Sequence, residues 1–376
     1  MYLTSRDQIR IEILSKYIEG TINRKHAQES LEIGERQFRR LVKRFKKDGV
    51  FALKHGNSGK IPQNKIKQEI ENKIVKLAGE KYKGFNMTHF YEKLPAELPE
   101  STIPSYSTVR RIFTENKLYV PQKKRKKRPH KSRNRYEREG IMIQIDGSEH
   151  EWFPSKKCCL ITAVDDANSK ILGATFSKSE TTFATMDVLE QVFNKHGLFH
   201  ILYSDMAGIY NDHKRGGFTN VTRGMKQLGI TCLMSQTAEA RGRIERAHRT
   251  LQDRLISELR LRNIRTIEEA NKYLPEFIEY YNQKFAVLPA NPESAFRSVP
   301  KDLQINEILC TVETRIVSNG YTISLDNEKY VITSDPGFAI KHRSVEIRTY
   351  RDGSKRFFIE GIELQVRRLL MANKAA

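Results

Sequence analysis

The sequence predicts a multi-domain protein: an α-helical N-terminal region with tandem helix-turn-helix units, an α/β core, and a small all-β C-terminal barrel. Three observations lead to this prediction. Apolar residues recur at helical spacing up to about residue 117, strand-like and helix-like stretches alternate from residue 140, and short strand-like stretches follow one another from 311 to 369. We expect helix-turn-helix units at 1–60 and 61–120, a basic linker at 121–139, the α/β core at 140–300 and the barrel at 301–376.

The charge balance indicates a polyanionic partner. Of the 376 residues, 66 are Lys or Arg and 45 are Asp or Glu, so the formal net charge is +21. An excess of this size is typical of proteins that bind nucleic acid, and an acidic membrane surface is the weaker alternative.

Several other classes are excluded. No run of about 18 apolar residues is present, which excludes a membrane span. The opening MYLTSRDQIRIEI has no apolar segment of the kind that directs secretion. None of the four cysteines forms a C-x-x-C pair, which disfavours a zinc finger or a disulfide scaffold.

The first 50 residues predict three short helices. Ser5 begins the first and Gly20 ends it, Thr21 caps a second that runs to about Leu31, and the third covers 35–47. The third helix has an apolar stripe and is basic elsewhere. This arrangement indicates a helix-turn-helix, whose last helix lies in the DNA major groove. A small solvated helical bundle is the alternative.

A second helical unit follows the linker at 55–63. Helices are expected at about 64–82, 86–94 and 105–117, and the last carries Arg110 and Arg111. We interpret this unit as a second helix-turn-helix.

Residues 123–138 are the most basic segment of the chain, since ten of the sixteen are Lys or Arg. Charges of one sign repel, so we expect an extended segment that follows a phosphate backbone. A localisation signal is the alternative. The side chains expected to contact DNA in the helical units and the linker are Arg36, Arg39, Arg40, Lys43, Arg44, Arg110, Arg111, Lys123, Lys124, Arg125, Lys126, Lys127 and Arg128.

The pattern changes at Gly140 to strands and helices. Strands are predicted at 141–146, 158–167, 170–177, 200–205 and 230–236, and helices at 182–195, 242–262 and 267–283. The closely spaced strands beyond residue 310 include a hairpin turn at Asp352-Gly353 and predict the barrel.

Three acids of the core form a candidate metal site. Asp146 and Asp205 each end a predicted strand, and Glu245 lies early in the long helix. Carboxylates on neighbouring elements repel one another unless a proton or cation intervenes, and oxygen ligands select Mg²⁺ or Mn²⁺. Two such ions about 3.5–4 Å apart would activate a water or a 3′-hydroxyl for phosphoryl transfer on DNA. For one aspartate alone, a turn cap is the simpler interpretation.

The segments IQIDGSEHEWF, YSDMAGIY and ARGRIERAHRTLQDRLISELR resemble the catalytic blocks of DDE transposases and retroviral-type integrases, most of all the ISNCY-type transposases of bacterial insertion sequences. The resemblance continues through EEANKYLPEFIEYYNQKFAVLPANPESAF and covers most of residues 10–300. It implies an RNase H-like catalytic core in which Asp146, Asp205 and Glu245 are the catalytic, metal-binding acids.

Some residues near the acids allow more than one interpretation. Glu239 is an alternative third acid, but Glu245 matches the family block. Glu245 lies 40 positions after Asp205, an interval somewhat longer than in retroviral integrases, and we expect a loop at 211–224 to hold the extra length. His248 stands where the family usually has Asn. We expect it to contact DNA or a metal-bound water, with a surface histidine as the alternative.

Other residues of this region have simpler expectations. Arg241, Arg243 and Arg249 are expected to contact DNA. For the pair Asp165 and Asp166 we expect a role in a turn. Trp152 and Phe153 are expected in the core rather than beside a base.

The resemblance implies a DNA transposase that binds the terminal inverted repeats of an insertion sequence, nicks the element end and joins its 3′-hydroxyl to target DNA. The expected cofactor is Mg²⁺ or Mn²⁺, two ions per site. The expected partners are double-stranded DNA and at least one further copy of the chain, in the bacterial cytoplasm with the nucleoid. The alternatives are a catalytically silent, transposase-derived DNA-binding regulator and a structure-specific RNase H-like nuclease.

Overall fold

The computed structural model describes residues 5–53, 65–118, 133–154, 156–211, 217–235 and 241–369. The chain forms two compact units that divide inside helix α4 (Gln68–Gly79), between Glu71 and Asn72. Among the described residues no helix is long and apolar enough to cross a membrane. All four cysteines are free thiols.

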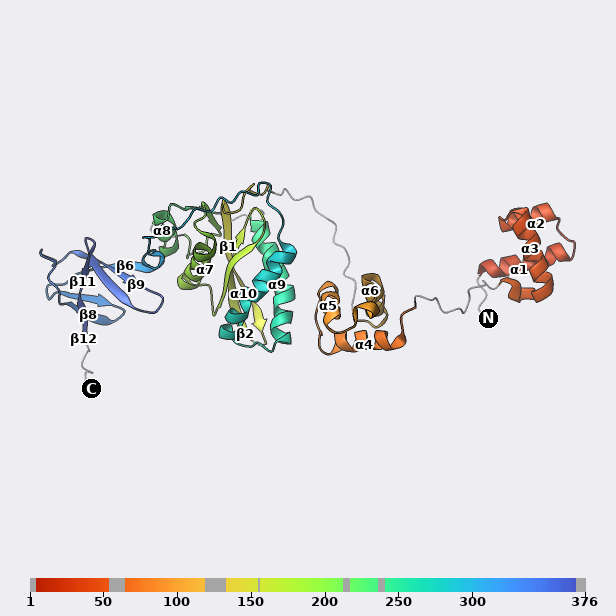
Figure 1. The fold of residues 1–376 in the computed structure, drawn as a ribbon, viewed down its shortest axis with the longest axis horizontal. Coiled ribbons are helices and arrows are strands. Elements are labelled where there is room, and N and C mark those ends of the chain that lie inside the picture. Colours follow the sequence, from red (N-terminus) through yellow and green to blue (C-terminus); the bar gives the residue numbers. More distant parts are fainter. Residues whose placement is uncertain are drawn as a thin grey trace. The chain divides into compact units, whose positions relative to one another are not determined.

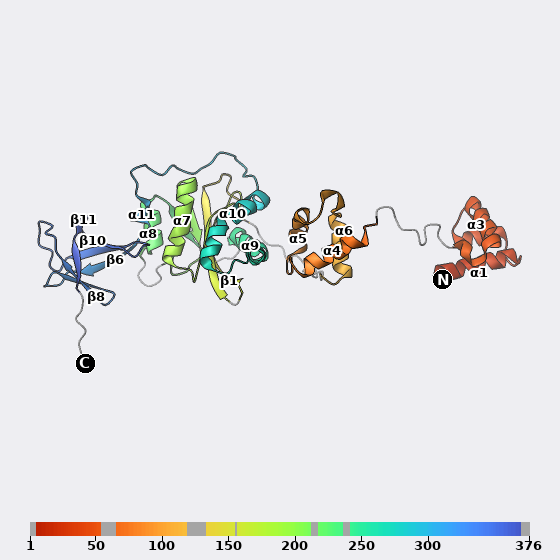
Figure 2. The ribbon, with the colours of Figure 1, turned by 60° about the horizontal axis from the view of Figure 1, so that its bottom comes forward.

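The first unit contains the three helices that the sequence predicts. They are α1 (Ser5–Ile18), α2 (Arg24–Leu31) and α3 (Glu35–Asp48), followed by the 3₁₀ helix η1 (Gly49–Leu53). Figure 2 shows α1 and α3 packed together. Leu14, Ala27, Leu31 and Phe38 form the buried core of these helices. This small core leaves the basic side chains of α3 exposed to solvent.

The predicted cap of α2 is wrong. The side chain of Asn23, and not that of Thr21, accepts a hydrogen bond from the free backbone N–H of His26 in the first turn. The Thr21 hydroxyl instead donates to the carbonyl oxygen of Lys16, where α1 ends. Thr21 therefore stabilises the end of one helix rather than the start of the next.

The next helices are shorter than expected but lie at the predicted places. They are α4, α5 (Met87–Lys93) and α6 (Tyr106–Glu115), with the short 3₁₀ helices η2 (Leu94–Ala96) and η3 (Glu100–Thr102). Asn86 and Ser105 cap α5 and α6 through their side chains. The rings of Phe90 and Phe113 pack with their centroids 4.9 Å apart, which joins α5 to α6.

The core domain is built on a mixed five-stranded sheet with the order β3-β2-β1-β4-β5. The strands are β1 (Met142–Phe153), β2 (Lys156–Asp165), β3 (Ile171–Ser177), β4 (Ile201–Ser204) and β5 (Thr231–Met234). β2 is antiparallel to both β1 and β3, whereas β4 and β5 run parallel to β1. This mixed α/β arrangement fits the RNase H-like core that the sequence predicts.

Helices cover both faces of the sheet (Figure 1). One face is packed by α7 (Thr182–His196) and the other by α9 (Gly242–Leu261) and α10 (Ile267–Phe285). Two separate apolar cores result, one on each side, because the central strands bury side chains in both directions. The expected loop at 211–224 is wrong in part, since α8 (Asn220–Gln227) occupies its second half, capped by Thr219.

The C-terminal region follows the short helix α11 (Ile305–Ile308) and is all-β. Its strands are β6 (Thr311–Ile316), β7 (Thr322–Leu325), β8 (Glu328–Ile332), β9 (Ser344–Thr349), β10 (Lys355–Ile359), β11 (Ile362–Leu364) and β12 (Val366–Leu369). Within residues 311–369 they pair as two sheets, β11-β10-β9-β6 and β12-β8-β7, over one shared core, rather than as a single closed sheet. The predicted turn at Asp352-Gly353 joins β9 to β10, with φ of 80° at Gly353.

Gly197, which ends α7, offers a test of the core. Its φ of 102° and ψ of −169° suit glycine almost alone, and a Cβ there would lie 2.4 Å from the carbonyl oxygen of Arg297. We expect Gly197→Ala to lower the free energy of unfolding by about 3 kcal/mol or more, from backbone strain and the clash together. Calorimetry of the full chain measures it.

Gly229→Ala is the matched control. Its φ of 67° is also positive, but a Cβ there meets only the end of the Arg297 side chain, at 3.5 Å. It should cost about 1–2 kcal/mol. Equal losses in the two variants would contradict the role of the Arg297 backbone.

Candidate active site

Two of the three predicted acids lie side by side on neighbouring parallel strands. The pairing of β1 with β4 places Met142 beside Ile201 and Gln144 beside Tyr203. The same register, continued by two residues, places Asp146 beside Asp205. Asp146 and Asp205 therefore lie close together, as we expect of acids on neighbouring elements of the sheet.

The expectation that Asp146 ends its strand is wrong. Asp146 lies inside β1, opposite Thr162 of β2, and the antiparallel pairing continues beyond it to Phe153. The parallel neighbour β4 stops at Ser204, so only one side of β1 loses its partner at this point. Asp146 therefore lies beside the end of β4, while β1 itself continues to Phe153.

A single cationic side chain lies between the two aspartates. Nη1 of Arg241 is 3.6 Å from Oδ1 of Asp146 and 3.6 Å from Oδ2 of Asp205. The other carboxylate oxygen of Asp205 accepts a hydrogen bond from the backbone N–H of Ala207. Nε of Arg241 is buried and has no hydrogen-bond partner among the residues that the structure describes. The guanidinium thus occupies the place between the aspartates without satisfying all its own donors.

Burial and like charge perturb the acids strongly. Burial raises the pKa of Asp146 to about 6, the Arg241 guanidinium opposes the rise, and the charges of Asp205 and Glu245 add to it. Burial, with the charge of Asp146, likewise raises the pKa of Glu180 to about 7. Such shifts are typical of sites where charge is concentrated for chemistry or ion binding.

Glu180 is a nearby acid that the sequence analysis missed. It lies between β3 and α7, and its Oε1 accepts a hydrogen bond of 3.2 Å from the hydroxyl of the buried Tyr210. A Cβ on Gly147 would come within 2.8 Å of its Oε2, so glycine beside Asp146 makes room for it. A polar turn after a strand was the only sequence signal for Glu180.

Glu245 lies in the first turn of α9 and is half-buried. Its charge reaches Asp146, whose pKa it raises. Among the residues that the structure describes, however, no three His, Cys, Asp or Glu side chains are placed so that they could hold a metal ion together. The alternative acid Glu239 lies outside the described residues.

His248 is buried beside Asp146 rather than exposed on the surface of α9. Its side chain is buried, Nε2 hydrogen-bonds to Oγ1 of Thr162 at 2.7 Å, and Nδ1 is 3.9 Å from Oδ2 of Asp146. Burial lowers the pKa of His248 to about 4, so the ring is neutral near pH 7. This burial contradicts both the expected DNA contact and the surface alternative, and makes His248 a neighbour of Asp146.

Three polar contacts align α9 with the two central strands. Ile244 N donates to Oε1 of Gln144, His248 bonds Thr162 opposite Asp146, and Nε2 of Gln252 donates to Oγ of Ser148. Four helical residues rise about 6.0 Å and two strand residues about 6.6 Å, so the two repeats nearly match. We call this set the polar ladder. It fixes the first turn of α9, and with it Glu245, relative to Asp146.

The arginines of α9 differ in whether their side chains are exposed and able to contact DNA. Nη1 of Arg243 is 3.1 Å from Oδ1 of the buried Asp166, so its expected DNA contact is wrong in this structure. Arg249 is exposed, as expected of a DNA contact, and so are Arg110 and Arg111. The expected contacts at Lys123, Lys124, Arg125, Lys126, Lys127 and Arg128 lie outside the described residues.

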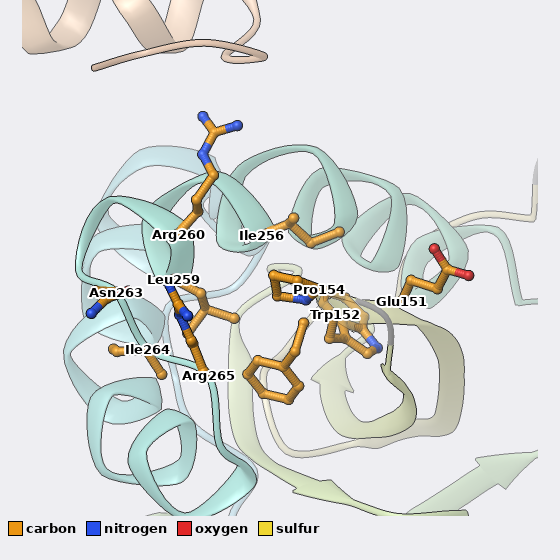
Figure 3. A pocket seen from close by; sticks show the side chains of 10 residues that line it. Glu151, Trp152, Pro154, Ile256, Leu259, Arg260, Asn263, Ile264 and Arg265 are labelled. Atoms are coloured by element: carbon orange, nitrogen blue, oxygen red, sulfur yellow. The ribbon is translucent and has the colours of Figure 1, made fainter. Parts of the chain in front are cut away.

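Trp152 and Phe153 are buried core residues, as expected. A cavity of about 260 Å³ beside them is lined by Pro154, Ile256 and Leu259 among others (Figure 3). Leu259 lies 14 residues beyond Glu245, about 21 Å along α9. The cavity is therefore separate from the acids.

The core therefore has the form of an α/β domain with two aspartates side by side at the end of a parallel strand pair. Comparison of the sequence gives the family. The chain is 34% identical over 362 residues to a protein of Sinorhizobium fredii named transposase y4bF, covering 93% of this chain and 78% of that one. It is 32% identical over 362 residues to the transposase for insertion sequence IS1202 of Streptococcus pneumoniae, covering 85% and 77%. The chain belongs to the insertion-sequence transposases.

Solved structures give weaker likenesses. The HTLV-2 integrase catalytic core domain in complex with magnesium matches 36% of this chain and 87% of its own, with 17% identity and a TM-score of 0.28. The simian T-cell lymphotropic virus intasome in complex with a PP2A regulatory subunit matches 74% and 94%, with 12% identity and a TM-score of 0.36. No model of a protein family matches the chain.

The raised pKa of Asp146 predicts that the ionised side chain destabilises the fold, and that this effect depends on pH. An acid whose pKa is about 6 in the fold and 3.8 in the unfolded chain destabilises the fold once both states are ionised. In metal-free buffer, Asp146→Asn should therefore raise the stability of the core at pH 7 by on the order of 2 kcal/mol. The gain should shrink as the pH falls from about 6 to about 4.

Calorimetry across this pH range is the measurement, and Asp302→Asn, at an exposed aspartate, is the control. A variant no more stable than the wild type at pH 7 would show that Asp146 carries no such cost.

Proposed function

We propose that this chain is a DNA transposase that acts through Asp146, Asp205 and Glu245. The observation that carries the proposal is the placement of Asp146 and Asp205 about one guanidinium of Arg241, 3.6 Å from each. Family membership supports the same function, because relatives of this length and identity are named as transposases. The helical units would bind the terminal inverted repeats, and the linker would follow the backbone between them and the core.

The donor set fits a divalent metal. Asp146 and Asp205 offer carboxylate oxygens, the ligands that Mg²⁺ and Mn²⁺ prefer, and a cationic group already lies between them. Two bound ions would activate the attacking oxygen and stabilise the leaving oxygen. In this proposal Arg241 gives up its place to the ions and Glu245 supplies a third carboxylate from the first turn of α9.

The remaining residues have supporting roles. Neutral His248 holds α9 against β2 without adding positive charge beside the acids. Exposed Arg249, one helical turn beyond Glu245, is placed on α9 where a phosphate backbone could approach. Pairing of two element ends requires at least two copies of the chain on DNA.

Removal of an acid tests the reaction. Asp146→Asn, Asp205→Asn and Glu245→Gln should each lower Mg²⁺-dependent joining of an element-end duplex to target DNA by at least about 10³-fold, because each removes a carboxylate of the metal site. Binding of the end duplex should stay near that of the wild type. Gel-based joining and fluorescence anisotropy measure the two properties.

Glu268→Gln is the control for Glu245→Gln, since Glu268 also lies in the first turn of a core helix but is exposed. Joining that survives in the three variants refutes the acid assignment. Wild-type protein that binds ends without cutting would instead be a regulator, and one that cuts without joining would be a nuclease.

The salt dependence of binding tests α3. Its residues Arg36, Arg39, Arg40, Lys43 and Arg44 are all exposed. Each phosphate contact contributes about 0.9 to the slope of log affinity against log salt. Arg40→Ala with Lys43→Ala should therefore reduce that slope by about 1–2 units.

Lys16→Ala is the control, since Lys16 lies on α1 in an ion pair with Glu12. A slope that does not change in the α3 double variant would remove α3 from the DNA-binding surface.

A further inference from the structure

Asp166, at the end of β2, gathers side chains from three parts of the core. Its side chain is fully buried. Oδ1 accepts hydrogen bonds from Nε2 of Gln144 at 2.8 Å and from a guanidinium nitrogen of Arg133, and lies 3.1 Å from Nη1 of Arg243. Oδ2 accepts the backbone N–H of Tyr136 at 3.0 Å. These partners belong to β1, to the first turn of α9 and to the segment that precedes β1.

The adjacent Asp165 has different hydrogen-bond partners. It too is buried, but its carboxylate accepts backbone N–H groups, from Ala167 and Asn168 in its own turn and from Gly140. Asp165 therefore builds the turn that the sequence predicts for both residues. Asp166 makes side-chain contacts that a turn does not need.

The carboxylate of Asp166 fixes the orientation of one amide. A carboxylate only accepts hydrogen bonds, so Nε2 of Gln144 must face Asp166 and Oε1 must face the other way. That oxygen accepts the backbone N–H of Ile244, one of the donors that the first turn of α9 cannot satisfy internally. Asp146 lies two residues beyond Gln144 on the same face of β1, and Glu245 follows Ile244.

Ion pairs link the segment before β1 and the first turn of α9 to Asp166. The side chains of Arg133 and Arg243 are 34% and 11% exposed, and both pair with the buried Asp166, whose single negative charge offsets part of their positive charge. Nη2 of Arg243 also donates to the carbonyl oxygen of Arg133. Loss of the carboxylate would leave two partly desolvated cations facing each other, which is strongly unfavourable.

We propose that Asp166 is a positioning residue for the active site: through Gln144 and Arg243 it sets the place of the first turn of α9, and so of Glu245, relative to Asp146. The inference rests on the proposed function of these acids. It also makes residues 133–136, which lead into the core, part of the support of the site. Asp166 itself touches none of the reacting groups.

Metal binding tests the proposal without reference to activity. Electron paramagnetic resonance during a Mn²⁺ titration of the full chain gives the Mn²⁺ concentration at half-saturation, the midpoint. It is measured for the wild type, Asp166→Asn and the matched control Asp165→Asn. We expect Asp166→Asn to raise the midpoint at least tenfold, because the amide at 166 can present a donor to Nε2 of Gln144 and release Ile244. Asp165→Asn should lower the melting temperature and leave the midpoint within about twofold of the wild type.

Equal midpoints in wild type and folded Asp166→Asn, or equal shifts in the Asp165 and Asp166 variants, would overturn the proposal. If Asp166→Asn does not fold, Gln144→Met decides, since it removes the amide and keeps the side-chain volume. The proposal then requires the same tenfold rise. Asp146→Asn separates this question from the proposed function: a wild type that binds no Mn²⁺, or binds it equally well as Asp146→Asn, refutes the metal site itself.

Discussion

The alignment of α9 along β1 is the constraint on which the candidate site depends. The polar ladder joins Ile244 to Gln144 at one end and Gln252 to Ser148 at the other, so the helix has one translational and rotational setting. A shift by one helical residue would turn Glu245 by about 100° around the axis. Apolar packing alone tolerates small slips, because it is not directional. The ladder therefore supplies the directional contacts that keep an acid on a helix in register with an acid on a strand.

Buried negative charge is concentrated around Asp146. Asp146 and Glu180 both have raised pKa values because burial and neighbouring carboxylates disfavour their charged forms. Arg241 relieves the repulsion between Asp146 and Asp205 but leaves its own Nε without a partner. In the proposed function, a metal ion would take the place of Arg241 between these acids. His248 is neutral and hydrogen-bonds to Thr162 of β2, so it adds no positive charge between Asp146 and Asp205.

The sequence predicts the order of helices and strands in the described residues well, because apolar periodicity reports which face of an element is buried. It predicts less well what depends on pairing. The polar stretch GSEHEWF shows no apolar run, yet antiparallel pairing with β2 continues β1 to Phe153 and places Asp146 inside the strand. The positions of His248 and Arg243 close to Glu245 in the predicted helix lead to the expectation of DNA contacts, with a metal-bound water as the other possibility for His248. Their burial depends on Thr162 and Asp166, which are distant in sequence.

Asp165 and Asp166 show where interpretation from the sequence alone reaches its limit. They are identical, adjacent and equally buried, and one role in a turn accounts for both at the level of the sequence. Side chains on successive residues point in different directions, so one carboxylate meets backbone N–H groups and the other meets Gln144 and two arginines. The first contributes to a local turn and the second connects three elements. Asp146 and Glu245, two of the three proposed catalytic acids, lie on two of those elements. In our proposal the position of the site therefore depends on a residue that is not part of it.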